Sequence, residues 1–353
     1  MKIFRFLMLM WLAVVGAWPA WAAPPRPADP PKEGSPDEIL DLSIEQLMNL
    51  ELIQTTIPGA HWHWEDDWMV GYQFMRVHNE GYRDGTRNVS NQETLKSFPT
   101  IHTDMTMDMH MFMLMYGPSN DVTLMFMLPY MDMSMNHLTN TGARFRTESS
   151  GFGDFRVSPI FPVYDEYPHR IQVETGLSFP TGSVTQRDVT PSGLTQLEYK
   201  MQTGSGTFDF HPAVTYLGQT ENMTWGAQVR GVIRTGRNER GYRQGDSLEF
   251  TTWWSPTISS SFSPSLRVDA LSWGNVKGFD PELARQTNPE SRGFLQGGEQ
   301  INLLLGLNFA LGLDEEGRGH RFSIEGGIPI YQNLRGPQLK EAWRIGGAWN
   351  WTF

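Results

Sequence analysis

The 353-residue sequence contains no cysteine, which excludes disulfide bonds and metal sites built on thiolates. After residue 22 it also lacks any apolar run of about 18 residues, and its mean hydropathy is −0.40, so a membrane-spanning helix is excluded. Positive charge is scarce as well, with 28 Lys and Arg against 39 Asp and Glu and a net charge of −11. This balance argues against nucleic acid as a partner.

The first 22 residues have the pattern of a secretory signal peptide. Lys2 and Arg5 precede an apolar run, and a small-residue motif ends at Ala22. We therefore expect an exported protein that is cleaved near Ala22. Stability must then come from packing or from a closed network of hydrogen bonds, because no disulfide is available.

Residues 23–58 are predicted to form a proline-rich linker that ends in one short amphipathic helix. Ser43 and Gln46 have the spacing of a capping box, which places the helix at about residues 44–50. The helix is expected to dock at the periplasmic mouth of the fold that follows.

Eleven of the 19 methionines lie between Met105 and Met135, at alternate positions in two segments. Alternate residues of a strand share a face, so the spacing predicts a β-hairpin with one methionine face and one face of Phe, Leu and Tyr. Turn-forming residues at 117–121 separate the segments. Closure near Ser119 would pair Met113 with Met125, and likewise Met111 with Met127 and Met107 with Met131.

The same alternation continues along the chain. A strand is predicted from Trp62 onward, with its aromatic residues outward, and the last strand ends at Phe353. Short connections alternate with long, polar, glycine-rich ones, which is typical of periplasmic turns and outer loops. We predict an all-β fold: a transmembrane antiparallel up-and-down β-barrel of about 12 strands over residues 59–353. Its expected place is the outer membrane of a Gram-negative bacterium, with membrane lipid and the barrel assembly machinery as partners.

Three segments resemble an outer-membrane transporter family named for the meta-pathway of phenol degradation. They are GFGDFRVS at Gly151 to Ser158, LSFPTGS at Leu177 to Ser183, and GSGTFDFHPAVTY at Gly204 to Tyr216. The resemblance extends over residues 60–353 and implies an outer-membrane transporter. The methionine hairpin goes beyond the general pattern of that family.

The methionine face is a candidate binding surface. Thioethers are soft, neutral ligands for Cu(I) or Ag(I), and they are also flexible apolar groups that suit an apolar lining or a packed wall. The candidate metal ligands are Met107, Met109, Met111, Met113, Met125, Met127, Met131, Met133, His110, His61 and His63. The other residues expected to line the lumen are Met69, Met75, Glu174, Asp209, His211, Arg230, Glu249, Arg267, Asp269 and Glu325.

These features predict an outer-membrane channel for passive uptake or efflux of a soft metal ion or a small apolar or aromatic solute. No cofactor is predicted, except that copper or silver could be the bound or transported ion. The alternative is a barrel enzyme of the protease or lipase type, because His102, Asp104 and His137 are expected at the outer rim. The sequence has no nucleophile elbow, phosphate loop or HExxH motif, so we expect no enzyme.

Overall fold

The computed structural model describes residues 56–283, 287–314 and 317–353. The long strands are β1 (Trp68–Gly85), β3 (Thr100–Ser119), β4 (Val122–Thr139), β6 (Phe155–Glu166), β7 (His169–Phe179), β10 (Asp209–Thr220), β11 (Met223–Arg234), β13 (Ser247–Pro256), β14 (Phe262–Trp273), β16 (Gly298–Leu311) and β17 (Gly319–Thr352). The shorter elements are β2 (Arg87–Val89), α3 (Asn91–Leu95), β5 (Arg144–Phe152), β8 (Arg187–Thr190), β9 (Gly193–Gln196), η2 (Tyr199–Met201), β12 (Tyr242–Arg243), β15 (Lys277–Gly278), η3 (Pro289–Ser291) and η4 (Gly293–Leu295). None of the described helices is long and apolar enough to cross a membrane.

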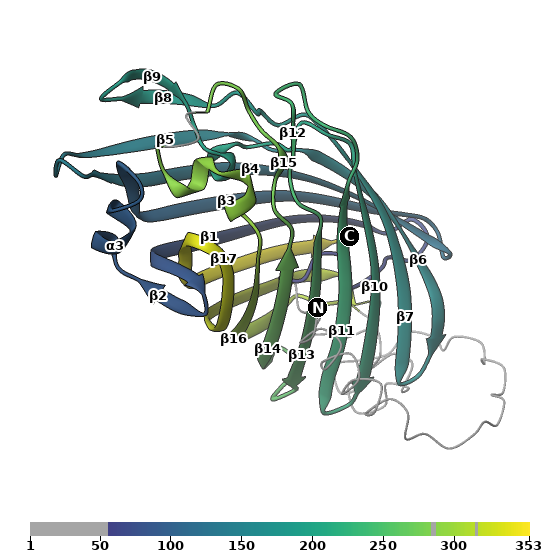
Figure 1. The fold of residues 1–353 in the computed structure, drawn as a ribbon. Helices are drawn as coiled ribbons and strands as arrows, with labels where there is room; N and C mark the ends of the chain where they lie inside the picture. Colours follow the sequence, from purple (N-terminus) through teal and green to yellow (C-terminus); the bar gives the residue numbers. More distant parts are fainter. Residues whose placement is uncertain (1–55, 284–286, 315–316) are drawn as a thin grey trace, which may run out of the picture. The chain divides into compact units, whose positions relative to one another are not determined.

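The eleven long strands form one antiparallel sheet that closes on itself where β17 pairs with β1 (Figure 1). β17 folds back within its own length, because its first half pairs with β16 and its second half with β1. It thus supplies two limbs, and the wall has twelve. The predicted all-β barrel of about twelve strands is confirmed.

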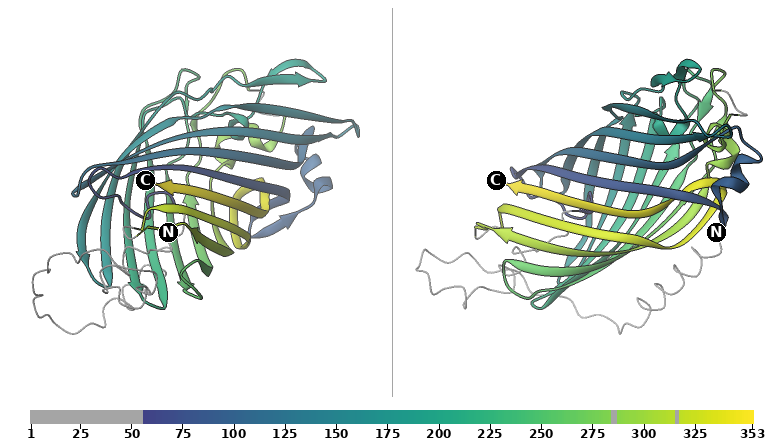
Figure 2. Two further views of the ribbon diagram at one scale, coloured as in Figure 1. Left: turned by 180° about the vertical axis from the view of Figure 1, so that it is seen from behind. Right: turned by 90° about the vertical axis from the view of Figure 1, so that its left-hand side faces the viewer.

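The two ends of the barrel differ (Figure 2). At one end, which we call the turn end, short connections join β3 to β4, β6 to β7 and β10 to β11, and the barrel's C-terminal residue Phe353 lies there. At the other, the loop end, long connections carry α3 and the β8–β9 hairpin (Figure 1). Two of the long connections contain regular structure, because β1 continues to Gly85 and β4 pairs with β5 in a hairpin that extends the wall.

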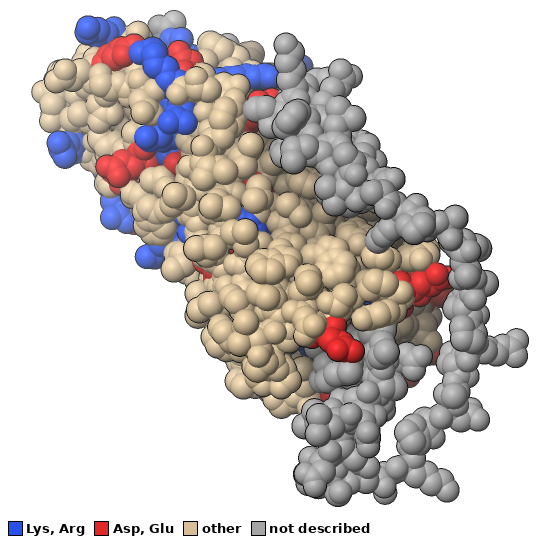
Figure 3. Space-filling model, turned by 90° about the horizontal axis from the view of Figure 1, so that it is seen from below, with Lys and Arg blue, Asp and Glu red and all other residues tan. Residues whose placement is uncertain are grey.

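Side chains alternate between the two faces of the wall as the sequence pattern requires. On β16, Leu305 is 67% exposed on the outside, while the adjacent Leu304 is 1% exposed on the inside. Charged side chains gather at one end of the outer surface in Figure 3, and most of the rest of that face is uncharged. An apolar outer band of this kind suits contact with lipid.

The β3–β4 hairpin has the predicted facing but not the predicted register. Met113 opposes Met127 rather than Met125, a displacement of two residues that applies to each predicted pair. The chain reverses between Ser119 and Val122, with an irregularity just before Ser119, so the turn closes later than expected. A shift of two residues leaves every side chain on its original face.

The strand predicted from Trp62 begins instead at Trp68, and residues 56–67 run through the inside of the barrel. The carbonyl oxygens of Thr56 and Pro58 accept hydrogen bonds from Gln73 of β1 (3.1 Å) and Gln228 of β11 (3.2 Å). Because these donors stand on different parts of the wall and point inward, the segment crosses the lumen. We call residues 56–67 the lumen segment.

The lumen segment is anchored at both of its ends. Near its start, Ile57 and Ala60 pack against Trp253 of β13. Near its end, the backbone N–H of His63 donates to the hydroxyl of Thr123 on β4 (2.8 Å). The prediction of a strand here was wrong because the wall is already closed by β1 and β17, which leaves this alternating stretch no strand to pair with.

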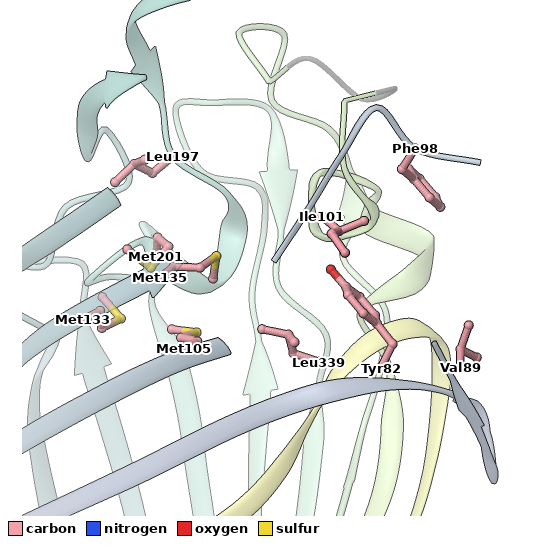
Figure 4. Close-up of a cluster of buried hydrophobic side chains, with 10 residues drawn as sticks. All are labelled: Tyr82, Val89, Phe98, Ile101, Met105, Met133, Met135, Leu197, Met201 and Leu339. Carbon is pink, nitrogen blue, oxygen red and sulfur yellow. The ribbon is translucent and has the colours of Figure 1, made fainter. Parts of the chain in front are cut away.

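The two largest buried apolar clusters of the described residues lie at opposite ends of the barrel. The turn-end cluster contains Met69, Met113, Met115, Met125, Met127 and Ile160. The loop-end cluster, drawn in Figure 4, contains Tyr82, Val89, Phe98, Ile101, Met105, Met133, Met135, Leu197, Met201 and Leu339. Trp62, predicted to face outward from a wall strand, instead packs against the turn-end cluster. The predicted helix at 44–50 lies outside the described residues.

Candidate functional site

The inward methionines form one continuous wall across β1, β3 and β4. In the middle of the barrel, Met75, Met109 and Met131 stand side by side on the three strands. At the turn end, Met69 and Met115 begin a second such row, which continues to β4. Directly opposed residues on neighbouring strands have Cβ atoms about 5 Å apart. The predicted thioether wall is therefore wider than one hairpin.

The two ends of the methionine wall are packed, and its centre is more open. Met115 and Met125 at the turn end and Met135 at the loop end are all completely buried. The half-buried methionines lie between the two clusters; they are Met75, Met107, Met109, Met111 and Met131. The part of the wall that a solute in the lumen can reach is thus this central stretch.

Gly71 of β1 makes room within the wall. A Cβ atom at Gly71 would lie 3.1 Å from the terminal methyl of Met113 and 2.7 Å from the amide oxygen of Asn350. A larger side chain would therefore displace Met113 from the row. The wall depends on this glycine as well as on the methionines.

A charged wall faces the methionines. Glu174 of β7 lies 3.3 Å from Arg230 of β11 and 3.6 Å from Arg156 of β6. The guanidinium of Arg156 also donates to the sulfur of Met127 at 2.6 Å, so the charged wall and the methionine wall are in contact at this point. Acidic and basic groups alternate here, so the charged wall is close to neutral.

The charged wall continues across β14 and β17. The guanidinium of Arg267 is paired with the carboxylate of Glu325, and both side chains are about nine-tenths buried. Asp269 lies 3.2 Å from Arg344, and His211 on β10 contacts the hydroxyl of Ser178 at 3.0 Å. Asp209 and Glu249 are inward as well, so the structure brings every acidic, basic and histidine residue of the predicted lumen set to the inner face.

His61 and His63 lie in the lumen segment rather than on a wall strand. The Nε2 atom of His61 is 3.3 Å from the sulfur of Met69, and the two imidazole rings are 5.2 Å apart. Burial, together with the charge of Arg321, lowers the pKa of His61 to about 4. Burial also places the pKa of His63 well below its usual value. Both imidazoles are therefore neutral at pH 7, which is the form that binds metals.

His110 does not join the methionines. Its Nδ1 atom lies 2.7 Å from the hydroxyl of Tyr72 on the outer face, as its even position between inward methionines requires. His110 therefore cannot bind the same ion as the inward methionines, and its role as a metal ligand stays a prediction. Asp104 also faces away from the lumen, bonded to Asn136 (2.8 Å), so it cannot complete an enzyme-like set with His102.

The family-like segments meet at one carboxylate. Asp154 accepts hydrogen bonds from the backbone N–H groups of Gly182 (2.9 Å) and Ser205 (2.8 Å). Gly204 in turn donates to the carbonyl of Ser183 (2.9 Å), with its backbone against that of Gly182. The glycines are needed because a Cβ at either position would strike the opposite backbone. The glycine-containing parts of these motifs hold two loops together, and other residues of the same segments, such as Arg156 and His211, belong to the charged wall.

Sequence reasoning did not find the lumen segment. It placed His102 and His137 together at the outer rim, but it missed Glu198, which lies beside both of them. It also left Met105, Met115 and Met135 out of the ligand candidates, although their spacing places them on the same face. The alternation was a sufficient signal for these three methionines. No local signal distinguishes a segment inside the lumen from a wall strand.

Comparison with solved structures places the fold among outer-membrane barrels. An outer membrane channel from Pseudomonas putida F1 superposes with a TM-score of 0.61 at 11% identity, covering 84% of this chain and 99% of that one. The KdgM porin and a Pseudomonas aeruginosa FadL homologue cover 81% of this chain and 99% and 89% of theirs, at 10% and 7% identity, with TM-scores of only 0.36 and 0.38. No curated protein matches in sequence.

A family model described as "Putative MetA-pathway of phenol degradation" matches residues 84–273. The match extends from the end of β1 to the end of β14 and includes the methionine hairpin and all three family-like segments. The chain is therefore a member of the MetA-pathway of phenol degradation family and has the fold of an outer-membrane channel.

Proposed function

We propose that this barrel is an outer-membrane channel that passes a soft monovalent cation, Cu(I) or Ag(I), along its methionine wall. The observation that carries the proposal is the contrast between the two faces of β3 and β4. Toward lipid these strands use Phe112, Leu114, Phe126 and Leu128, whereas toward the lumen the same strands use methionine almost throughout. If only apolarity were needed, the residues used outside would serve inside as well. What methionine adds is a polarisable sulfur ligand.

The His61–Met69 contact supports the proposal. A neutral imidazole nitrogen and a thioether sulfur lie 3.3 Å apart, next to buried Met115 and Met125 at the turn end. Nitrogen and thioether ligands without net charge suit Cu(I) and Ag(I) better than they suit hard cations such as Mg²⁺. The row Met75, Met109 and Met131 would then offer successive sulfurs between this end and the loop end.

Replacement of Met111, Met113, Met125 and Met127 by leucine tests the proposal. The swap keeps volume and apolarity while removing the sulfurs, and such changes cost little stability. We expect the purified variant to bind less Ag(I) than the native barrel in titration calorimetry and the cells that carry it to change their silver and copper content. Met223→Leu, a single exposed position outside the wall, is the matched control.

Two results would overturn the proposal. The first is Ag(I) binding by the folded leucine variant that equals that of the native barrel. The second is metal content that does not depend on the gene in cells under copper or silver stress.

A small apolar or aromatic solute is the second candidate, favoured by the phenol degradation in the family description. An aromatic ring could rest on the thioethers, which make favourable contacts with ring edges, while a polar substituent meets the charged wall. Leucine would support this traffic about as well as methionine. Unchanged flux of phenol into liposomes through the leucine variant, with Ag(I) binding absent from both proteins, would favour this candidate.

A further inference from the structure

A second cluster of candidate ligands lies at the loop end, separate from the methionine wall's central stretch. His102 of β3, His137 of β4 and Glu198, just before η2, bring one ligand atom each to within 4.8 Å of one another. Their side chains are buried, at 0%, 3% and 7% exposure. Three chain segments thus converge beside the loop-end cluster of Figure 4. Ile101 of that cluster directly precedes His102, and Met135 lies two residues before His137 on the same face of β4.

A β-bulge explains why His102 points inward beside His137, which stands at one of the inward odd positions of β4. His102 opposes His137, but two residues later Asp104 opposes Asn136, so Thr103 is an extra residue on β3. The extra residue reverses the facing of everything before it. His102, at an even position, is therefore turned to the lumen side although the even positions of the rest of β3 face outward.

Each of the three side chains is oriented by a partner on its other side. His102 Nδ1 lies 2.6 Å from a carboxylate oxygen of Glu290, and His137 Nε2 lies 2.8 Å from the hydroxyl of Thr147. The amide of Asn288 donates to Glu198 Oε1 at 2.6 Å. With Nδ1–H of His102 donating to Glu290, the lone pair of Nε2 is free, which is the arrangement seen at metal-bound histidines.

The atoms left over are His102 Nε2, His137 Nδ1 and Glu198 Oε2, and all three are buried without a hydrogen-bond partner. A buried polar atom without a partner costs about 1–3 kcal/mol. The alternative is that no ion binds and a protonated His102 bridges Glu290 and Glu198. This arrangement leaves His137 Nδ1 without a hydrogen-bond partner, and the distance from His102 Nε2 to Glu198 Oε1 is long, at 3.4 Å. One bound ion would satisfy all three atoms at once.

We propose that His102, His137 and Glu198 bind one divalent transition-metal ion, with Zn²⁺ as the probe that tests it. Two imidazoles and one carboxylate are a common three-residue zinc set that leaves a fourth position open. With bonds of about 2.1 Å, ligand atoms in a tetrahedral site lie roughly 3.4 Å apart, so atoms that lie within 4.8 Å of one another must approach by at most about 1.4 Å. Rotation of the Glu198 side chain, which stands in a loop, can supply part of this movement.

The charged groups nearest the three ligands are Glu290, which contacts His102 Nδ1, and the buried Lys200. The bound ion would tie the segment after β9 to the β3–β4 hairpin. Such a structural link between these two parts of the chain does not depend on the proposed transport of a soft cation.

Zinc titration of the metal-stripped barrel in detergent, in competition with a chromogenic chelator, tests the site. We expect one Zn²⁺ per chain, and a loss of affinity of more than about 10-fold in His137→Gln and in Glu198→Gln, since loss of an orienting partner alone costs that much. His169→Gln, at the turn end, is the matched control and should bind normally. Co²⁺ in place of Zn²⁺ should give the visible absorption of a four-coordinate site in the native barrel and in the His169→Gln control only.

The proposal is overturned if the folded native barrel binds no stoichiometric Zn²⁺, which would leave only the ion pair of His102 with its two carboxylates. Equal Zn²⁺ affinity in the native barrel and in Glu198→Gln would overturn it too. Glu198 is a loop residue outside the wall, so its isosteric variant should fold, and the mobility of the unheated barrel in gel electrophoresis checks this. The four-leucine variant keeps all three ligands, so the zinc site and the soft-cation proposal can fail separately.

Discussion

We predict that the lumen segment, residues 56–67, limits the conductance of the channel. Ile57 is its apolar anchor, 3% exposed and packed against Trp253 of β13. Ile57→Ala removes most of this contact without changing any wall strand. We expect the segment to leave its place more often, and the lumen to conduct more.

The magnitude follows from the burial. Truncation of a buried Ile to Ala costs about 2–5 kcal/mol. At the lower bound, the ratio of docked to undocked segment falls roughly 30-fold, because each 1.4 kcal/mol is tenfold in an equilibrium constant. The hydrogen bonds to the carbonyls of Thr56 and Pro58 are untouched, so the segment should still dock for most of the time.

Single-channel recording in planar bilayers measures the effect as the fraction of time in the highest conductance state. That fraction should rise by about the same factor of 30 while it remains small. Ile328→Ala is the matched control, because Ile328 is 56% exposed on the outer face of β17 and cannot touch the segment. Gly226→Ala offers a second route to the same result, because a Cβ at Gly226 would strike the ring of Trp253 and displace it.

Unchanged conductance in both Ile57→Ala and Gly226→Ala, with an intact barrel, would refute the reasoning. The lumen segment would then not be what limits passage. An equal rise in Ile328→Ala would instead point to a general loosening of the wall.

Two further expectations concern charge. Arg267→Ala should lower the free energy of unfolding in urea by about 3–5 kcal/mol, because it leaves the carboxylate of Glu325 buried without its basic partner. Arg76→Ala, which removes an ion pair on the outer surface, should change that free energy little. Comparable losses in the two variants would contradict the buried pairing. Ag(I) binding by His61 and Met69 should stay constant from pH 8 to about pH 5 and fall near pH 4, because burial lowers the pKa of His61 to about 4 and keeps the ring neutral above that value. Titration calorimetry at several pH values measures this, and a fall centred near pH 6.5, the ordinary value for histidine, would show that the ring is not buried as described.

The facing of the wall strands could be predicted from the sequence because it is a local property. A strand turns successive side chains to opposite faces whatever it pairs with, so the spacing of Met105 to Met135 decided which residues would look inward. The same rule gave the inward charges, such as Glu174 and Arg267, and the outward Leu305. It also gave the number of strands, since each alternating stretch ends at a turn signal.

The register of the hairpin and the fate of residues 56–67 were decided only by the tertiary structure. Closing the turn one residue later than expected moves every partner by two residues and changes no facing, so alternation cannot detect it. The stretch before Trp68 alternates like a strand, yet the wall closes when β17 pairs with β1, and the segment then finds its hydrogen bonds inside the lumen.

The loop-end site shows the same limit most clearly. His102 is turned inward by one extra residue, Thr103, whose effect appears only when β3 is aligned with β4. Glu198 comes from a loop about 60 residues further along the chain than His137, and nothing local places it beside the hairpin. The sequence by itself determined which face of each strand meets the lumen, because that follows from the geometry of a single strand. The tertiary structure decided which residues meet across the lumen, because that depends on how the whole sheet closes.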